Sequence, residues 1–394
     1  VALRFARCFD VVGYDMDARR IEKLREKYGA GCGSIRFTSL EEELSRAAFY
    51  IVTVLTPVDE RKNPDLTCLV EATRTVARYL KRGDYVVYES TVYPGCTEEV
   101  CVPLLEKGSG LKLGADFKVG YSPERINPND SEHTFSNTAK IVSANDGQAL
   151  DEVVRVYAEV VSADLCRASG IRVAEAAKMT ENVQRSVNIA LMNELQRLFS
   201  RMGIDMGEVI DMASSKWNFV KYRPGLGGGH CIPVDPLYLV SAASKLGVEM
   251  PVTSSGCAVN DGMAAYVVRS LLGAMGSDGR GARALLMGVT YKENIDDIRN
   301  SRIAEMVGLL EREGMSVDVT DPHADPDKVY AMYGIRPVPA LRPPYDLIVV
   351  AVAHDEYRGL DDAYFRSISR GAALLGDIRG LYKGRIKSLG YWSL

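Results

Sequence analysis

The sequence lacks any long apolar run, and this absence limits what the chain can be. No stretch of about 18 consecutive apolar residues occurs, so we expect no membrane-spanning helix. No signal peptide is recognisable either, and we expect a cytoplasmic protein. The net charge is -4, so the chain does not have the excess of basic residues that is typical of nucleic-acid-binding domains. A small anionic ligand remains compatible with that charge, because a few arginines can outweigh it locally.

Patterned cysteines and clustered histidines are also absent. The eight cysteines follow no repeated spacing, which excludes an evident disulfide framework or zinc site and favours a reducing compartment. The four histidines lie far apart in the sequence, at His133, His230, His323 and His354. We therefore expect no metal site.

A glycine-rich stretch at residues 223–236, RPGLGGGHCIPVDP, is the most distinctive feature that is present. Its glycines, Gly228 among them, allow close approach of the backbone to a ligand. Prolines on both sides of Cys231 are predicted to stop a helix and to hold the thiol on a stiff turn. With Asp235 nearby, the thiol could act as a nucleophile at a carbonyl carbon. Alternatively, Cys231 could be a small apolar filler.

The first part of the chain indicates a dinucleotide-binding unit. Residues 1–9 resemble a helix, and Phe9–Tyr14 is predicted to be a strand that ends at Asp15. In a βαβ unit of this kind, the carboxylate after the second strand accepts the ribose hydroxyls. The first strand and its glycine-rich turn would then precede Val1. The helix after the predicted strand leads into the segment 27–34, KYGAGCGS. Alternatively, the strand belongs to another α/β sheet.

Residues after the predicted strands mark the edge where a ligand would bind. Arg20, on the next helix, could stack on adenine or lie on a solvated face. Later strands end at Thr56-Pro57 and at Thr91, with a helix at 66–81 between them. Repeated strand, polar turn and helix predict a parallel doubly wound sheet, in which ligands bind at the carboxyl ends of the strands.

The next strand end carries two charged residues, Glu124 and Arg125, in the segment FKVGYSPERINPND. They could serve as a general base and an anion anchor, or simply form a salt bridge with each other. Both alternatives remain open from the sequence.

A long amphipathic helix is predicted at residues 166–203, followed by a shorter one at 203–222 and further helices to 275. Lys178 and Asn182 are four residues apart and lie on one face. Glu181 and Arg185 have the same spacing and suggest a surface ion pair. A helix of this length commonly bridges domains or forms a dimer interface.

A second α/β region follows a boundary at 276–281. Its strands are predicted to end near Asp321, His354 and Asp377. The loop with Lys292, Arg299 and Arg302 suits a diphosphate, or it is a solvated loop with the local partners Asp296 and Asp297. We therefore predict three segments at 1–165, 166–275 and 276–394.

Seven motifs in consistent order resemble those of the nucleotide-sugar 6-dehydrogenases. They are the strand ending in Asp15, VLTPVD, ESTVYPG, SPER, EAAKMTENVQRSVNIALMNE, GLGGGHCIPVDP and YKENIDDIRNSR. The SPERINPND segment, followed by His133, is similar to the UDP-N-acetylhexosamine branch more than to the UDP-glucose branch. The resemblance implies an α/β fold in which two Rossmann-like, doubly wound parallel-sheet domains are joined by a long central helix and a helical dimerisation region.

The resemblance also implies two successive NAD-dependent oxidations at C6 of a UDP-linked amino sugar, from alcohol through aldehyde to acid. Cys231 matches the nucleophile that forms a thiohemiacetal and then a thioester. Lys178 and Asn182 match the oxyanion donors. Glu124 and Asp235 match acid/base residues, and Thr91 positions the water.

The remaining expected contacts fall into two groups. Cofactor contacts are expected at Asp15, Arg20, Thr56, Pro57, Thr91 and Arg299. UDP-sugar contacts are expected at Glu124, Arg125, Lys178, Arg223, Gly228, Lys292 and Arg379. The resemblance implies a homodimer through the central helices, and the alternatives are a UDP-glucose 6-dehydrogenase or a non-catalytic UDP-sugar-binding protein. The residues do not decide which sugar epimer is bound.

Overall fold

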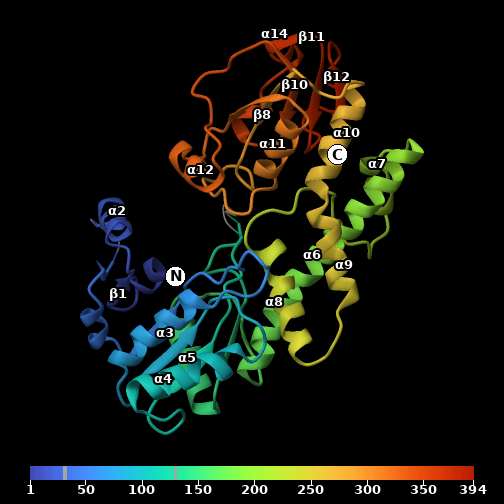
Figure 1. The fold of residues 1–394 in the computed structure, drawn as a ribbon. Helices are drawn as coiled ribbons and strands as arrows, with labels where there is room; N and C mark the ends of the chain where they lie inside the picture. Colours follow the sequence, from blue (N-terminus) through green and yellow to red (C-terminus); the bar gives the residue numbers. More distant parts are fainter. Residues whose placement is uncertain (30–32, 128–129, 131) are drawn as a thin grey trace. The chain divides into compact units, whose positions relative to one another are not determined.

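A computed structural model describes residues 1–29, 33–127, 130 and 132–394 of the chain (Figure 1). The chain divides into two compact units. Unit 1 comprises Val1–Glu181 and Leu237–Glu249, and unit 2 comprises Asn182–Pro236 and Met250–Leu394. Cys32 and part of both the 27–34 and SPERINPND segments lie outside the described residues. The three-segment division stays a prediction.

Unit 1 contains two sheets and the helices around them (Figure 1). The strands are β1 (Val11–Tyr14), β2 (Ile35–Thr38), β3 (Phe49–Val52), β4 (Tyr85–Tyr88), β5 (Lys118–Tyr121), β6 (Lys140–Ala144) and β7 (Leu165–Arg167). The helices within it are α1 (Ala2–Phe5), α2 (Ala18–Tyr28), η1 (Glu41–Arg46), α3 (Thr67–Tyr79), η2 (Thr97–Cys101), α4 (Val102–Ser109) and α5 (Gly147–Ala158). The predicted strands and the 66–81 helix are confirmed, whereas the helix predicted at 1–9 is limited to α1.

The sheets of unit 1 are mainly parallel. β1 pairs with β2, and the larger sheet has the order β3-β4-β5-β6-β7. Of its neighbouring pairs, β5 and β6 alone run antiparallel among the described strands. The carboxyl ends of β3, β4 and β5 therefore lie at one edge, which brings the loops after these strands together.

Residues of unit 1 form these elements because apolar side chains recur where the sheet must be covered. Val87 and Val142 come from the sheet and are buried with Phe5, Val153 and Tyr157 from α1 and α5. Aspartates cap two of the helices: the Asp17 carboxylate accepts the N–H of Arg19 at the start of α2, and Asp146 caps α5 in the same way. The core thus fixes the sheet, and the sheet fixes the loops at its edge.

Unit 2 contains one parallel sheet and most of the remaining helices (Figure 1). Its strands are β8 (Arg283–Met287), β9 (Ser316–Thr320), β10 (Tyr345–Val350), β11 (Ser369–Asp377) and β12 (Gly390–Ser393). The helices that follow β7 in the chain are α6 (Ile171–Met202), α7 (Met206–Ala213), α8 (Cys231–Lys245), α9 (Pro251–Asp261), α10 (Met263–Met275), α11 (Arg302–Arg312), α12 (Pro326–Tyr333), α13 (Asp355–Arg358) and α14 (Asp362–Ile368). The first residues of α6 and the last of α8 belong to unit 1.

The sheet of unit 2 has the order β12-β11-β10-β8-β9 and is parallel throughout its described pairs. Leu286 and Val349 pack against α10 and α11 on one face. Leu285 and Ile348, one position earlier, pack against Phe365 of α14 on the other. Because adjacent strand residues point to opposite faces, both faces are buried, which confirms the predicted doubly wound arrangement.

Two predicted helices have different bounds. Residues 165–167 form the edge strand β7, so the long helix begins at Ile171 and not near 166. The helix predicted at 203–222 is α7, which ends at Ala213. Among the described residues, no helix combines the length and apolar character that crossing a bilayer would require.

Candidate active site

One face of α6 carries several buried polar side chains, and the first of them are Glu175, Lys178 and Asn182. Their spacing of three and four residues places them above one another on the helix. Lys178 Nζ donates a hydrogen bond to the carbonyl oxygen of Glu124 at 2.6 Å. α6 therefore directs a cation toward the loop after β5 within unit 1.

The carboxylate of Glu124 is held by the backbone of its own loop. The N–H groups of Arg125 and Ile126 each donate to Glu124 Oε1 at 2.7 Å. The Arg125 guanidinium instead pairs with Glu181 at 2.7 Å. The alternative of a Glu124–Arg125 salt bridge is therefore wrong, and so is the expected Glu181–Arg185 pair, because the turn after β5 brings Arg125 to the side of α6 that carries Glu181.

The loops after β3 and β4 are tied together at the predicted cofactor edge. Thr56 Oγ1 donates to the carbonyl of Thr91 at 2.7 Å, and Ser90 Oγ donates to the carbonyl of Val54 at 2.6 Å. The hydroxyl of Tyr238 donates to the carbonyl of Pro57 at 2.8 Å. The structure thus brings Thr56, Pro57 and Thr91 together, and Tyr238 is a contact that the sequence analysis missed.

The predicted nucleotide-binding carboxylate, Asp15, follows β1 and is partly exposed. Its Oδ1 accepts the N–H of Asp17 at 3.0 Å, and its Oδ2 lies 3.2 Å from Arg20 Nη1. A carboxylate at the carboxyl end of a parallel strand fits the hydroxyls of an adenosine ribose. The position of Asp15 therefore suits the adenosine ribose of NAD.

A buried carboxylate, Glu175, holds the loop that follows Thr91. Its two oxygens accept the N–H groups of Gly95 at 2.6 Å and Thr97 at 2.9 Å. Burial raises the pKa of Glu175 to about 7, although these hydrogen bonds act in the opposite direction. The sequence analysis missed Glu175, which its position three residues before Lys178 could have revealed.

Cys231 is the first residue of α8, and its side chain is exposed. The prediction that prolines stop a helix here is wrong. Pro233 lies in the first turn, where the backbone N–H has no intrahelical partner, so that proline costs little. Pro236 lies inside the helix and removes one hydrogen bond. The thiol thus sits at a helix N-terminus, where a thiolate is favoured.

Asp235, one turn further along α8, is buried and accepts a hydrogen bond from the Asn182 side-chain amide of α6. Both residues belong to unit 2. The two predicted catalytic residues are therefore in direct contact, and the amide of Asn182 retains a second N–H for another acceptor.

The glycine loop before Cys231 is held by amides from distant parts of unit 2. Asn193, fully buried on α6, accepts the N–H of Gly225 at 2.9 Å and donates to its carbonyl at 3.2 Å. Asn300 Nδ2 donates to the carbonyl of Gly229 at 3.0 Å. Gly229 has φ +85°, and a Cβ there would lie 2.8 Å from the Tyr291 ring. Sequence reasoning missed Asn193 and Asn300, although a polar residue among the apolar positions of α6 was a visible signal.

His230, next to Cys231, stays neutral more readily than an ordinary histidine. Burial, followed by the positive charge of Arg299, lowers the pKa of His230. Its Nε2 is buried and has no hydrogen-bond partner among the described residues. A neutral imidazole beside Cys231 adds no cationic partner for its thiolate.

The cationic loop of unit 2 has acidic partners of its own. Arg299 donates to both oxygens of Asp297, with the shorter bond from Nη2 at 2.5 Å. Arg302 pairs with Asp261 and Glu305. The local-partner alternative therefore holds for Arg299 with Asp297, whereas the partners of Arg302 are carboxylates that the alternative did not name. A diphosphate would have to compete with all of these carboxylates.

The other predicted substrate residues surround the glycine loop or lie on the surface of unit 2. A Cβ at Gly228 would lie 3.0 Å from both Asn300 and Tyr291, and a Cβ at Gly225 would lie 3.8 Å from Arg379 Nη1. Arg223 lies 3.4 Å from Asp211 in an exposed pair. The structure thus brings Arg379 to the glycine loop and gives Arg223 a separate partner.

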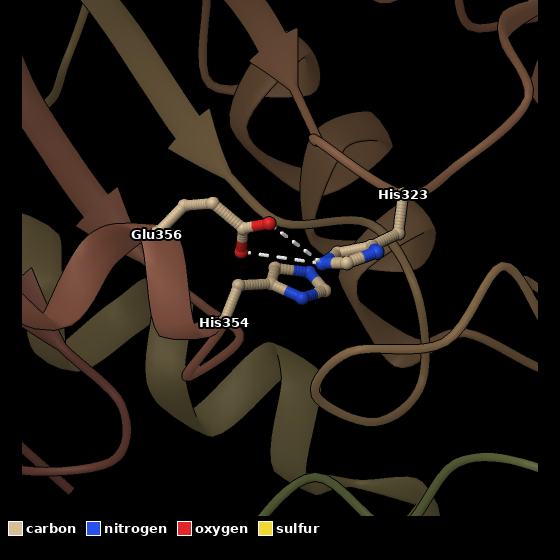
Figure 2. Close-up of side chains that lie close together, drawn as sticks. All are labelled: His323, His354 and Glu356. Carbon is tan, nitrogen blue, oxygen red and sulfur yellow. Dashed lines mark hydrogen bonds and ion pairs between the residues drawn. The ribbon is translucent and has the colours of Figure 1, made fainter. Parts of the chain in front are cut away.

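Two histidines of unit 2 meet, contrary to the expectation that all four lie apart. The ring centroids of His323 and His354 are 4.7 Å apart, and Glu356 faces His323 (Figure 2). They meet because β9 and β10 both border β8, which brings segments distant in the sequence together. One ligand atom of each residue lies within 4.8 Å of the others.

This histidine pair does not make a good metal site. His354 Nδ1 accepts the backbone N–H of Asn294 at 3.0 Å, and His354 Nε2 lies 3.2 Å from Asp321 Oδ2. A neutral imidazole has one lone pair for a metal, and here Asn294 uses it. A metal would therefore have to break a buried backbone hydrogen bond.

Comparison with known proteins agrees with this organisation. Three models of the UDP-glucose/GDP-mannose dehydrogenase family match: the NAD binding domain at residues 2–161, the central domain at 172–262 and the UDP binding domain at 285–384. The chain is 44% identical to a UDP-N-acetyl-D-glucosamine 6-dehydrogenase of Pseudomonas aeruginosa, over 97% of this chain and 94% of that one. It is 42% identical to the protein of the same name from Salmonella typhi, over 96% and 92%. A solved UDP-D-ManNAc dehydrogenase from Pyrococcus horikoshii aligns with a TM-score of 0.89 at 28% identity, covering 100% of this chain and 95% of that one.

Glu175→Gln should flatten the pH dependence of stability. Because burial raises the folded-state pKa of Glu175 from 4.5 to about 7, the carboxyl binds its proton more tightly in the folded protein. Its contribution to stability is fully present below the unfolded pKa and is lost as the pH rises through the folded pKa. From about pH 5 to about pH 8, wild type should lose on the order of 2 kcal/mol that the variant does not lose.

Denaturant unfolding at both pH values measures this difference. Glu194→Gln, an identical change at an exposed position of α6, controls for replacing a carboxylate by an amide. If the free energy of unfolding changes equally with pH in wild type and in Glu175→Gln, the prediction is contradicted.

Proposed function

This chain belongs to the UDP-glucose/GDP-mannose dehydrogenase family, and we propose that it oxidises the C6 hydroxyl of a UDP-N-acetylhexosamine to the carboxylate. It is an NAD-dependent dehydrogenase, with an NAD binding domain at residues 2–161. The observation that carries the choice of substrate is the 44% identity to a UDP-N-acetyl-D-glucosamine 6-dehydrogenase over nearly the whole chain. UDP-N-acetylglucosamine is therefore the favoured substrate.

The second oxidation requires a nucleophile, which we assign to Cys231. An aldehyde carbon cannot release a hydride readily until it is tetrahedral, so the sulfur adds to C6 and the carbonyl oxygen takes a proton. NAD, when bound, accepts the hydride that leaves C6. As the hydride leaves, the C6 hydroxyl gives up its proton to a neighbouring base, and the product is a thioester on Cys231. Attack by water then releases the acid and returns the thiol. The exposed position of Cys231 at the start of α8 supports this role.

Lys178 and Asn182 are assigned to the oxygen on C6. Both donors are buried, and a fixed donor in a dry environment stabilises a developing negative charge more than it would in water. Glu124 and Asp235 are assigned to proton transfer during thioester hydrolysis, and Thr91 to positioning the water. The bonds that hold Glu124 and Asp235 in place support these roles.

The remaining contacts follow the two nucleotide-binding domains. We assign Asp15, Arg20, Thr56, Pro57 and Arg299 to NAD. A further group is assigned to the UDP-sugar: Arg125, Arg223, Gly228, Lys292 and Arg379. The position of Arg379 near the glycine loop supports its assignment.

Rates on three UDP-sugars test the substrate. We expect kcat/KM for UDP-N-acetylglucosamine to exceed that for UDP-glucose by about tenfold or more, because a site built for the acetamido group leaves polar partners unpaired with glucose. UDP-N-acetylgalactosamine reports on the C4 epimer. Faster turnover of UDP-glucose would favour a UDP-glucose 6-dehydrogenase, and UDP-sugar binding without NADH formation would favour a non-catalytic protein.

Cys231→Ser tests the nucleophile. A serine hydroxyl is scarcely ionised at neutral pH, so we expect the second oxidation to slow by about a hundredfold or more, with close to one NADH formed per UDP-sugar in place of two. NADH absorbance and product analysis give the ratio. Cys166→Ser, at an exposed cysteine of β7, should keep two NADH per sugar. Two NADH at the wild-type rate from Cys231→Ser would exclude Cys231 as nucleophile.

We propose a homodimer formed through the central helices. Leu191, Leu198 and Met202 of α6 are between 48% and 59% exposed in the single chain. Their spacing of seven and four residues places them on one face, an apolar stripe that a second copy would cover. Leu198→Glu should therefore halve the mass measured by sedimentation, whereas Met332→Glu, at an exposed methionine of α12, should not. A wild-type protein that sediments as a monomer at micromolar concentration would reject the dimer.

We also propose a cytoplasmic location. Cys8, Cys68, Cys96, Cys101 and Cys166 carry free thiols, which persist in a reducing compartment. Recovery of the protein outside the cytoplasm in cell fractionation would reject this location.

A further inference from the structure

The loop that follows β8, residues 288–294, is held by two buried side chains from neighbouring strands. Asp321 follows β9 and His354 follows β10, and β8 lies between these strands in the sheet. The side chains of Asp321 and His354 are fully buried. Because the strands are parallel, their carboxyl ends place both side chains beside the loop (Figure 2 shows His354).

Asp321 holds the beginning of the loop. Its Oδ2 accepts the N–H groups of Val289 at 2.6 Å and Thr290 at 3.1 Å. Its Oδ1 accepts the N–H of His323 at 2.8 Å. Burial alone would raise the pKa of Asp321, but the hydrogen bonds from His354 and the backbone lower it overall, so the carboxylate stays ionised.

His354 holds the end of the loop. Its Nδ1 accepts the N–H of Asn294 at 3.0 Å, at a residue with φ +59°. The Asn294 side chain in turn accepts the N–H of Asp355 at 3.0 Å. Since a backbone N–H can only donate, Nδ1 must be unprotonated, and the ring proton lies on Nε2, which faces Asp321 at 3.2 Å.

The segment between these two anchors carries Tyr291 and Lys292. Thr290 Oγ1 donates to the carbonyl of Lys292 at 2.9 Å, which closes the turn. The Tyr291 ring packs against Gly229, two residues before Cys231. The pKa of Tyr291 is raised by burial, then by the negative charges of Asp297 and Cys231.

We propose that His354, fixed as its Nε2–H tautomer by Asp321, is a positioning residue that holds the 288–294 loop in the shape that binds the diphosphate of the nucleotide sugar through Lys292. The assignment rests on the proposed function, because that function places Lys292 on the UDP-sugar. His354 acts through the loop and touches neither substrate nor cofactor. Loss of the Asn294 bond would release the end of the loop while the Asp321 bonds still hold its beginning.

Two conservative variants separate the bonds of His354. In His354→Gln, the terminal amide can replace Nε2–H and keep the bond to Asp321, but the Asn294 N–H loses its acceptor. In His354→Asn, the side-chain oxygen can take the position of Nδ1 and keep the Asn294 bond. His323→Gln is the control, since the His323 side chain contacts Glu356 and the His354 ring and leaves both anchors in place.

Hydrogen exchange and UDP binding give the readouts. For His354→Gln we expect amide exchange at Asn294 to accelerate by about tenfold and the Kd for UDP by calorimetry to rise by about tenfold, the effect of losing one buried hydrogen bond. KM for the UDP-sugar should rise similarly, with kcat and KM for NAD within about twofold. His354→Asn and His323→Gln should stay near wild type in all of these.

The outcomes separate the two proposals. Wild-type exchange at Asn294 and wild-type UDP affinity in His354→Gln would overturn the role of His354, and so would equal defects in the Gln and Asn variants. Faster exchange in His354→Gln without any change in UDP affinity would show that the loop does not bind the diphosphate, and would also overturn it. If wild type itself does not bind UDP, the proposed function fails, while the exchange data still report whether His354 holds the loop.

Discussion

The two hydrogen bonds between Asn193 and Gly225 are the constraint on which the rest of the proposed site in unit 2 depends. A loop rich in glycine has no side chains of its own to hold it, so its conformation must be imposed by neighbours. Asn193 supplies a donor and an acceptor to one end of the loop, and Asn300 supplies a donor to the other. Tyr291 fills the space that the missing side chain at Gly229 leaves. Cys231 then follows a backbone that is already fixed.

Loops of unit 1 are also fixed by side-chain hydrogen bonds to their backbone, but the side chains are carboxylates in place of amides. Glu175 accepts two N–H groups from the loop after β4, and Glu124 accepts two from its own turn after β5. In unit 2, Asp321 does this for the loop after β8. Loops at the carboxyl edge of a parallel sheet expose backbone N–H groups that no strand pairs, and a buried acceptor satisfies them while fixing the loop. Glu175 and Asp321 hold loops that follow other strands, so the shape of these loops depends on which elements the fold places beside them.

The sequence was sufficient for features that depend on local pattern. Strand and helix order and the doubly wound sheets follow from apolar runs that alternate with polar turns and helical segments. The common face of Lys178 and Asn182 follows from the helical period of about 3.6 residues. Features that depend on partners distant in the sequence were not predictable. The contact between His323 and His354 follows from β9 and β10 both bordering β8, and the Arg125–Glu181 pair follows from the position of α6 beside the loop after β5. The start of α8 at Cys231 was mispredicted because the rule that proline stops a helix does not apply to the first turn. For the candidate site, the sequence therefore indicated residues but not the bonds that hold them.

Nearly every polar group that the proposed chemistry uses already has a partner within its own unit. Lys178 donates to the carbonyl of Glu124, the Asn182 amide donates to Asp235, and Arg299 donates to Asp297. Such pairing is required, because a buried cation or amide without a partner would destabilise the fold. It also means that a ligand gains only the difference between its own bonds and those it displaces. Lys178 and Asn182 keep further N–H groups and can serve a substrate oxygen without losing these partners. Arg299 is held at both oxygens of Asp297, so an anion must share or displace that carboxylate, and binding there is weaker than the charge of the guanidinium alone would suggest.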